Sequence, residues 1–294
     1  MTRLLILGGG GMLGHKLWQT ALPRLETKAT VRSGAPFFVH RGYPPGSVLP
    51  HVDVSDPNTL MRAFAVTRPQ VVVNCVGVVK QLTAAKDPLL SISLNSLLPH
   101  QLADVCQAVG ARLIHISTDC VFSGRRGMYR ESDPSDAEDL YGRSKYLGEV
   151  GRPGCLTIRT SIIGRELGTQ NGLVEWFLSN RGRTVHGYEK AIFSGLTTNA
   201  LSTLILDLVQ NYPDLSGVYQ VAADPINKYD LLELLNAAYQ AGATIERDGS
   251  VAIDRSLDAT RFREATSFTA PSWPDMIAAM AADPTPYDQW RSNQ

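Results

Sequence analysis

The sequence predicts an α/β protein in which a doubly wound parallel sheet is joined to a smaller C-terminal lobe. Short apolar runs alternate with segments of helical pattern over the first 165 residues, and a glycine-rich stretch follows the first run. After about Gly164 this alternation loosens. Alternating strands and helices form right-handed crossover units, so we expect a parallel sheet that is covered by helices on both faces.

The expected elements follow from local signals along the chain. Residues 3–7 form an apolar run that ends in glycine, and residues 71–76 are mostly β-branched, as buried strands are. Asp56-Pro57 and Asp87-Pro88 each place an N-cap residue before a proline at the first helical position. We expect strands at 3–7, 28–32, 49–54, 71–76, 112–116, 156–159 and 217–221, helices at 12–22, from 57, from 88 to about 108 with a kink at Pro99, and at 229–239, and an irregular loop at 37–50.

Composition excludes several classes of protein. Lys+Arg and Asp+Glu both number 28, so the net charge is zero and we expect neither a nucleic-acid partner nor a membrane partner. No apolar run approaches the ~18 residues that a bilayer span requires. The cysteines fit neither a zinc pattern nor a small disulfide framework, so we expect no metal, free thiols and a cytoplasmic location. They are Cys75, Cys106, Cys120 and Cys155.

A glycine loop lies between the first expected strand and the first expected helix. Gly8, Gly11 and Gly14 give the spacing G-x-x-G-x-x-G. Such glycines allow a tight turn, close approach of a pyrophosphate to the backbone, and close packing of helix on strand. The helix that starts at Met12 and Leu13 would offer free N–H groups to the anion. The alternative is a plain tight turn, but the position of the loop favours a Rossmann-type nucleotide site.

Residues at the ends of the next strands extend this expected cofactor site. NAD-binding folds often place an acidic residue near the ribose 2′-hydroxyl, but this chain has Arg32 and Ser33 there. Arg32 can pair with a 2′-phosphate, which favours NADP(H) over NAD(H), or it can be a solvated loop residue. The Asp53 carboxylate, beside Val54, can accept a hydrogen bond from the adenine amino group, or the pair can merely begin a turn. The fourth strand adds Asn74, Cys75, Val76 and Gly77 at the same edge.

Tyr141 and Lys145 carry the strongest signal for chemistry. Residues four apart share a face of a helix, and a lysine beside a tyrosine favours the phenolate and lowers its pKa. Thr118, with Ser117, can hold a carbonyl oxygen against the phenol. We therefore expect Thr118, Tyr141 and Lys145 to protonate an alkoxide as hydride reaches carbon. Taken alone, the pair also fits a surface helix.

These motifs, in this order, resemble the extended short-chain dehydrogenase/reductases. Within them, three segments resemble the dTDP-4-dehydrorhamnose reductase group: residues 116–124 (Ile-Ser-Thr-Asp-Cys-Val-Phe-Ser-Gly), Tyr141-Gly-Arg-Ser-Lys followed by Leu147-Gly-Glu, and Arg159-Thr-Ser. The likeness is strong to about residue 165 and looser through residues 195–197, 217–222 and 256–258. The chain departs from the group at Cys120, where a tyrosine is usual, and in the loop at residues 78–82.

The resemblance implies a function. It implies an NADPH-dependent reductase of the 4-keto group of a nucleotide-linked 6-deoxyhexose, with Thr118, Tyr141 and Lys145 catalytic and NAD(H) as the less favoured cofactor. Residues 1–165, with 195–225 returning to them, would bind NADP. Residues 166–194 and 226–294 would form a smaller substrate-binding lobe. The expected substrate contacts are Lys80, Ser117, Thr118 and Tyr141.

Other functions remain open at this point. The partner we expect is the nucleotide-sugar substrate, and the assembly we consider is a homodimer. A nucleotide-sugar dehydratase or epimerase shares the fold and the Tyr/Lys pair. Dehydratases carry an Asp-Glu pair after the threonine, where this chain has Asp119 and Cys120. Some relatives are non-catalytic NADP-binding regulatory subunits.

Overall fold

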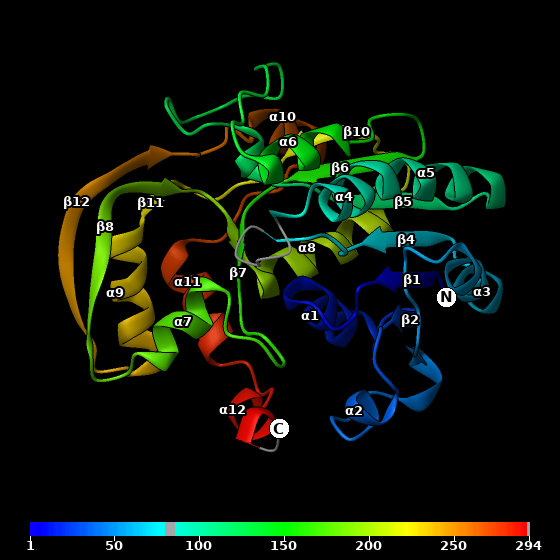
Figure 1. Cartoon of the computed structure of the whole chain (residues 1–294), viewed down its shortest axis with the longest axis horizontal. Helices are drawn as coiled ribbons and strands as arrows, with labels where there is room; N and C mark the ends of the chain where they lie inside the picture. The colour runs from blue at the N-terminus through cyan, green and yellow to red at the C-terminus, as the bar shows by residue number, and fades with distance from the viewer. Residues whose placement is uncertain (80–85, 293–294) are drawn as a thin grey trace.

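A parallel sheet forms the centre of the molecule, which we describe from a computed structural model covering residues 1–79 and 86–292. Its seven strands lie in the order β10-β6-β5-β4-β1-β2-β3 (Figure 1). They are β1 (Arg3–Leu7), β2 (Glu26–Thr30), β3 (Val48–Leu49), β4 (Val71–Asn74), β5 (Arg112–Ile116), β6 (Cys155–Arg159) and β10 (Gly217–Gln220). The strand order reverses between β1 and β4, and the carboxyl edge at such a point is where open α/β sheets bind ligands.

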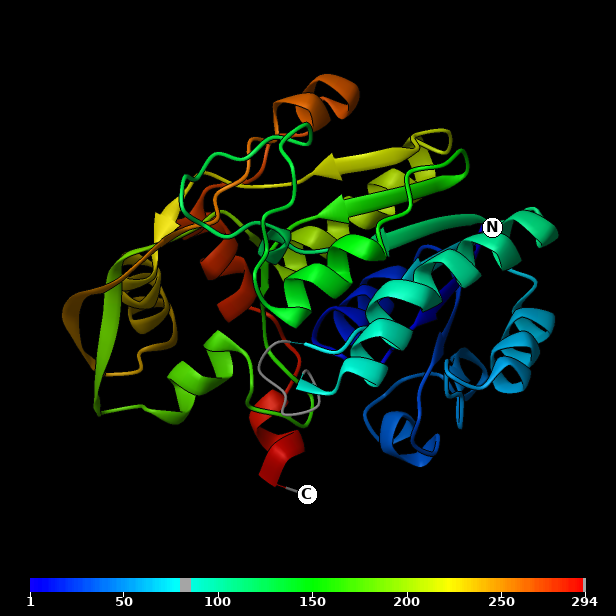
Figure 2. The same cartoon turned by 45° about the horizontal axis from the view of Figure 1, so that its top comes forward.

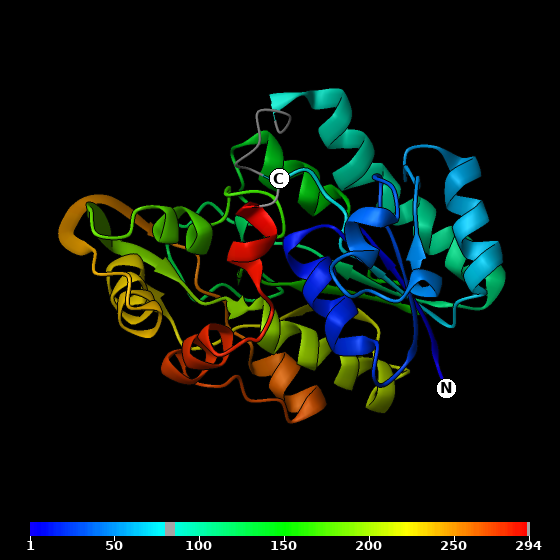
Figure 3. The same cartoon turned by 90° about the horizontal axis from the view of Figure 1, so that it is seen from below.

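Helices cover both faces of the sheet because its side chains alternate between the faces. Leu4 and Ile6 of β1 join the core under α1 and α8, whereas Leu5 and Leu7 join the core under α3 and α5. Seen from below, α1 and α8 pack side by side (Figure 3). These helices are α1 (Met12–Ala21), α3 (Pro57–Thr67), α5 (Leu98–Val109) and α8 (Thr198–Asn211). The doubly wound, Rossmann-type fold predicted from the sequence is confirmed.

A smaller lobe lies beyond the carboxyl ends of the strands. Its three-stranded sheet has the order β11-β8-β12, and a two-stranded β7-β9 ladder adjoins the main sheet. Figure 2 shows β6 and β10 running toward this lobe. The remaining strands and the helices around them are β7 (Ile162–Ile163), β8 (Thr184–Phe193), β9 (Leu196–Thr197), β11 (Ile226–Asn227), β12 (Thr244–Asp254), α7 (Leu173–Ser179), α9 (Lys228–Tyr239), α10 (Thr260–Thr266), α11 (Trp273–Ala281) and α12 (Tyr287–Ser292). Within residues 195–225, β10 joins the main sheet and α8 packs on it, while the functional division into two domains stays a prediction.

Several expected elements differ from the structure. The strand expected at residues 28–32 is β2 at Glu26–Thr30, so Arg32 and Ser33 lie beyond its end. β3 ends at Leu49 instead of reaching residue 54, because Pro50 has no N–H for the ladder and His51 has a positive φ of 56°. Asp53 and Val54 therefore lie in a turn. The expected loop at residues 37–50 instead contains α2 (Pro36–Val39) and the 3₁₀ turn η1 (Pro45–Ser47).

The long helix that begins at Asp87-Pro88 is interrupted. It is divided into α4 (Pro88–Ser91), a π-helical segment η3 (Ile92–Leu97) and α5. Pro99 cannot donate to the carbonyl of Asn95, four residues earlier, so the regular hydrogen-bond ladder is broken there. Among the described residues, no helix has both the length and the apolar character needed to cross a bilayer.

Candidate active site

Tyr141 reaches the end of β5 because α6 (Leu140–Leu147) lies very close to the turn η4 (Asp119–Val121). Asp139 caps α6 by accepting a hydrogen bond from the Gly142 backbone N–H at 2.7 Å. A Cβ at Gly142 would lie 2.2 Å from the Cys120 carbonyl oxygen, so only glycine permits this approach. This approach brings the Tyr141 phenol close enough to the Thr118 hydroxyl for that hydroxyl to act on its pKa.

Thr118 is held by its own turn. Its hydroxyl accepts from the Cys120 N–H at 3.1 Å and lies 3.1 Å from a carboxylate oxygen of Asp119. Burial raises the pKa of Asp119, an effect opposed by Arg255. Arg255 in turn donates to the Phe122 carbonyl oxygen at 2.9 Å, which ties the lobe to this turn.

The electrostatics differ from the expectation that Lys145 lowers the pKa of Tyr141. Burial, reinforced by Cys120, raises the pKa of Tyr141 above its ordinary value, and the nearby Thr118 hydroxyl opposes this only in part. Lys145 Nζ instead donates to the Ile116 carbonyl oxygen at 2.7 Å, and the side chain is buried. Tyr141 is therefore a neutral phenol near pH 7, which is the form that can donate a proton.

A buried ion pair lies directly behind these groups. Glu149 accepts two hydrogen bonds from Arg159, at 2.8 Å and 2.7 Å, and one from the Ser117 hydroxyl at 2.7 Å. Both charged side chains are only 5% exposed. Burial lowers the pKa of Lys145 to about 8, while the Glu149 carboxylate acts to raise it. The pair thus contacts Ser117, a predicted substrate residue, and its carboxylate raises the pKa of Lys145, a predicted catalytic residue.

The glycine loop forms the tight turn that its spacing predicts. Gly8 has φ +84°, and its N–H donates to the Thr30 hydroxyl at 3.1 Å. A Cβ at Gly14 would lie 2.1 Å from the Gly8 carbonyl oxygen, so glycine is required for α1 to approach the loop. Thr30 was not among the predicted site residues, because nothing in its local sequence indicates this contact.

The first turn of α1 has room for an anion. Gly11 caps the helix without a side-chain hydrogen bond, and no acidic residue lies in the first turn. Gly10 and Gly11 are exposed, and a Cβ at either would meet only ordinary contacts. Packing does not require glycine at these two positions, but a pyrophosphate at the backbone does. Leu13 is buried in the core and Met12 is half-buried, so we expect both to contact a nucleotide mainly through the backbone.

The residues at the ends of β2 and β3 lie in different settings. Arg32 and Ser33 follow β2 and are exposed. Among the described residues, none forms a hydrogen bond or ion pair with the Arg32 guanidinium. Asp53 is exposed as well, but its carboxylate accepts from the Ser55 N–H at 2.9 Å and builds the turn that also contains Val54. A contact from Asp53 to adenine stays a prediction.

The end of β4 lies beside Lys145. A Cβ at Gly77 would be 3.9 Å from Lys145 Nζ. The Asn74 amide is already bonded to the His115 ring at 3.1 Å and accepts from the Val76 N–H at 3.0 Å, so it has a structural use. Burial raises the pKa of the Cys75 thiol to about 12, which makes it neutral. Lys80, the predicted substrate contact, lies outside the described residues.

Two further residues near the site were not predicted. Asn95, inside the π-helical segment, binds both backbone groups of Val78 and the Ser144 hydroxyl, and so holds the chain after β4 against α6. Pro99 was the signal that the helix is irregular there. Lys228 begins α9, where burial lowers its pKa and Asp119 and Cys120 act to raise it.

No metal centre is evident within residues 1–79 and 86–292, where no group of three His, Cys, Asp or Glu side chains has the arrangement of metal ligands. The absence of a metal stays a prediction.

Comparison with known proteins identifies the group to which these features belong. The family described as RmlD substrate binding domain matches residues 1–241. A dTDP-4-dehydrorhamnose reductase of Streptomyces griseus is 37% identical over 148 residues, which are 50% of this chain and 43% of that protein. The enzyme of the same name from Mycolicibacterium smegmatis is 30% identical over 169 residues, or 55% of this chain and 46% of that one. The aligned region thus spans about half the length of these relatives.

Solved structures share the fold at low identity. A dTDP-4-dehydrorhamnose reductase of Bacillus anthracis, in complex with NADP, has a TM-score of 0.75 at 20% identity and covers 95% of this chain and 98% of its own. A dTDP-glucose 4,6-dehydratase of the same organism, in complex with NAD, has a TM-score of 0.78 at 15% identity, covering 100% and 99%. At these identities the likeness shows the fold alone, because both reactions are found on it.

Proposed function

This chain belongs to the RmlD substrate binding domain family, and on that premise we propose that it is an NADPH-dependent reductase of the 4-keto group of a nucleotide-linked 6-deoxyhexose. The observation that carries the proposal is the contact of Tyr141 with Thr118, beside a buried Lys145. The names of the two relatives at 37% and 30% identity support the same substrate class.

The proposed chemistry assigns each residue one task. A bound reduced nicotinamide supplies the hydride. Tyr141, a neutral phenol near pH 7 that burial keeps protonated to higher pH, donates the proton to the carbonyl oxygen. Thr118 orients that oxygen, and Lys145 places a positive charge near the developing alkoxide. A positioned general acid typically contributes ~10²–10⁴ in rate.

The cofactor contacts proposed here follow the carboxyl edge of the sheet. The backbone at Gly8, Gly11 and Gly14 and the start of α1, at Met12 and Leu13, would hold the pyrophosphate. The remaining contacts would come from the segments at or after the ends of three strands and from α6. Arg32 and Ser33 would bind the 2′-phosphate, and Asp53 and Val54 the adenine. Asn74, Cys75, Val76 and Gly77, with Tyr141 and Lys145 of α6, would lie on the ribose and nicotinamide side. The exposed Arg32 favours NADPH over NADH.

The substrate is proposed to lie between this edge and the smaller lobe. Ser117, Thr118 and Tyr141 would contact the sugar, and Lys80 a phosphate. Residues 1–165 with 195–225 would act as the cofactor domain, and 166–194 with 226–294 as the substrate lobe. Homodimer formation and a cytoplasmic location stay predictions.

Dehydration and epimerisation are less favoured than reduction. A 4,6-dehydratase needs a general base after the aspartate, and this chain has a thiol there, at Cys120. An epimerase must keep NAD through the whole cycle, which an arginine suited to a 2′-phosphate does not favour. A non-catalytic regulatory subunit has no need of a buried Lys145 beside a protonated Tyr141.

The test is a panel of dTDP-, UDP- and GDP-linked 4-keto-6-deoxyhexoses and a free ketohexose, read as NADPH oxidation. We expect at least one nucleotide-linked sugar to be reduced and the free sugar to lose kcat as well as affinity, because the nucleotide's binding energy is used for positioning. NADPH binding without oxidation of any of them would point to the regulatory subunit. Reduction of the free sugar at an equal rate would contradict the substrate class.

A further inference from the structure

Glu149 has contacts that its place in the sequence does not explain. It follows the last turn of α6 and is four residues beyond Lys145. Its carboxylate is buried and takes hydrogen bonds from two other elements, Arg159 of β6 and Ser117 just after β5. Burying an ion pair costs several kcal/mol in desolvation, so a hydrophobic replacement would usually serve stability equally well. Stability alone therefore gives little reason to place this charge here.

The location of the pair relative to the site supplies another reason. Lys145 Nζ is held by the Ile116 carbonyl oxygen at 2.7 Å, and Ile116 is the residue before Ser117. Ser117 is bound to Glu149 and precedes Thr118, the partner of Tyr141. One carboxylate thus fixes the backbone segment that carries the Lys145 acceptor and the Thr118 hydroxyl.

We propose that Glu149 is a positioning residue of this site, whose carboxylate holds Ser117 in place and keeps the buried Lys145 positively charged. The inference rests on the proposed function in so far as Lys145 acts in reduction. It goes further because it names the residue that keeps Lys145 protonated. That residue, Glu149, is not among the proposed cofactor or substrate contacts.

The groups around Lys145 make Glu149 the main source of this effect among the described residues. From the end of β4, Cys75 adds no charge, because burial holds its thiol neutral up to a pKa of about 12. From β5, His115 is neutral, because burial lowers its pKa well below the ordinary value. From β6, Arg159 is cationic, but it is paired with Glu149 itself. Burial alone would drive Lys145 further toward its neutral form.

The first experiment measures the charge of Lys145 directly, in the cofactor-free full-length protein. Lysine labelled with ¹³C at Cε is titrated by NMR, and the Lys145 signal is assigned as the one lost in Lys145→Arg. We expect wild-type Lys145 to titrate near pH 8, and Glu149→Gln to lower the midpoint by about one pH unit or more. An unchanged midpoint in folded Glu149→Gln protein overturns the proposal.

Two matched variants separate charge from structure. Ser117→Ala removes the hydroxyl that binds Glu149 but keeps the carboxylate, so its Lys145 midpoint should stay within about 0.3 units of wild type. Glu149→Asp keeps the charge on a shorter side chain and should restore at least half of the shift. If Glu149→Gln does not fold, Arg159→Gln supplies the comparison, because it frees the Glu149 carboxylate from its own cation. The Lys145 midpoint should then rise by about half a pH unit or more, and an unchanged midpoint overturns the proposal.

The second experiment uses catalysis. The alkaline limb of the kcat/KM profile should move to lower pH in Glu149→Gln. A one-unit shift leaves about a fivefold loss at pH 8 and little loss at pH 6. A loss that is equal at both pH values indicates a purely structural role and contradicts the proposal. If no reductase activity is found in wild type while the NMR shift appears, the proposed function fails and the role of Glu149 stands.

Discussion

Two of the buried ion pairs among the described residues are alike in burial but lie in different surroundings. Arg159–Glu149 lies behind the site, and its members are ten residues apart in sequence. Lys16–Asp283 joins α1 to the segment before α12, across a separation of 267 residues, at 2.6 Å. The first pair contacts Ser117 and acts on Lys145. The second has no predicted catalytic residue among its partners, so we expect the first to matter for chemistry and the second for stability.

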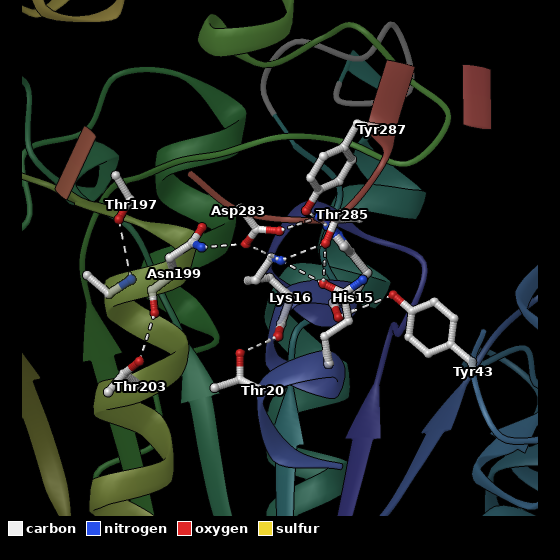
Figure 4. A network of polar contacts seen from close by, with 12 residues as sticks. His15, Lys16, Thr20, Tyr43, Thr197, Asn199, Thr203, Asp283, Thr285 and Tyr287 are labelled. Carbon is white, nitrogen blue, oxygen red and sulfur yellow. Dashed lines mark hydrogen bonds and ion pairs between the residues drawn. The ribbon is translucent and has the colours of Figure 1, made fainter. Parts of the chain in front are cut away.

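The Lys16 network shows how the second pair works (Figure 4). Lys16 Nζ also donates to Gln19, and Asn199 of α8 donates to the same carboxylate oxygen of Asp283 at 2.7 Å. The hydroxyl of Thr285, two residues beyond Asp283, accepts a longer hydrogen bond from Lys16 Nζ at 3.3 Å. The network therefore connects α1, α8 and the C-terminal segment, three parts of the chain that are distant in sequence.

The C-terminal helix continues this connection. The buried ring of His15 lies 2.8 Å from both the Gly11 carbonyl oxygen and the Tyr287 hydroxyl, and burial lowers its pKa to about 4. His15 is thus a neutral structural residue. Arg165 binds Glu175 and Asp288, which attaches α12 to the lobe. Figures 1 and 3 show α12 between α7 of the lobe and the α1–α2 side of the main sheet.

The largest expected effect is a loss of turnover with no change in stability. Tyr141→Phe keeps the ring and deletes the proton, so kcat should fall by at least ~10²-fold. NADPH binding and the midpoint of urea unfolding should stay near wild type. Stopped-flow NADPH oxidation and a urea titration measure the two quantities. Turnover close to wild type would refute the role given to Tyr141.

The next variant should lower stability and leave turnover nearly unchanged. Asp283→Asn leaves Lys16 charged and buried without its anion, which typically costs about 3–5 kcal/mol. The free energy of unfolding should fall by that amount, while kcat per folded molecule should change less than about twofold. The control is Glu189→Gln, which breaks the exposed pair with Arg247 and should cost less than about 1 kcal/mol. Equal losses in both variants would remove the distinction between buried and exposed pairs.

The same aspartate predicts an acid-dependent loss of stability. Burial opposes its ionisation, but hydrogen bonds from Lys16 and Thr285 prevail and lower the pKa of Asp283 from 3.8 to about 2. Its contribution is therefore complete above the unfolded value and is lost as pH falls from about 4 to about 2. By linkage this amounts to about 2 kcal/mol. Asp283→Asn should lack this part of the slope when unfolding is measured between pH 5 and pH 2, and an identical slope in both proteins would contradict the assignment.

The smallest effect concerns a charge that belongs to neither pair. Arg32 is exposed at the end of β2, so Arg32→Ala should alter neither stability nor kcat with saturating NADPH. A charge-assisted contact to a 2′-phosphate is worth about 1.5–3 kcal/mol, so the preference for NADPH over NADH should narrow by about tenfold or more. The kcat/KM values for the two cofactors measure it. Equal use of NADPH and NADH by wild type would contradict the role given to Arg32. Arg24→Ala, at another exposed arginine, is the control and should leave the cofactor preference unchanged.

Local signals predicted much of the site. The glycine spacing, the Asp-Pro helix starts at residues 56–57 and 87–88, and the four-residue step from Tyr141 to Lys145 each depend on neighbours in the chain. The pKa of Tyr141 could not be predicted in this way, because the burial that raises it depends on how α6 packs on the Cys120 turn. The two-residue length of β3 escaped prediction because an apolar run at residues 49–54 does not reveal the turn at His51.

The sequence by itself determined the alternation of strands and helices over about the first 165 residues, the tight turn at Gly8 and the helical face shared by Tyr141 and Lys145. Each of these depends on backbone sterics and on side-chain spacing over a few residues. Only the tertiary structure decided that Lys145 faces Ile116, that Glu149 and Arg159 pair behind Ser117, and that Asp283 returns to Lys16. Contacts between distant residues arise from burial and loop closure, and no local pattern records which partner a buried charge will meet.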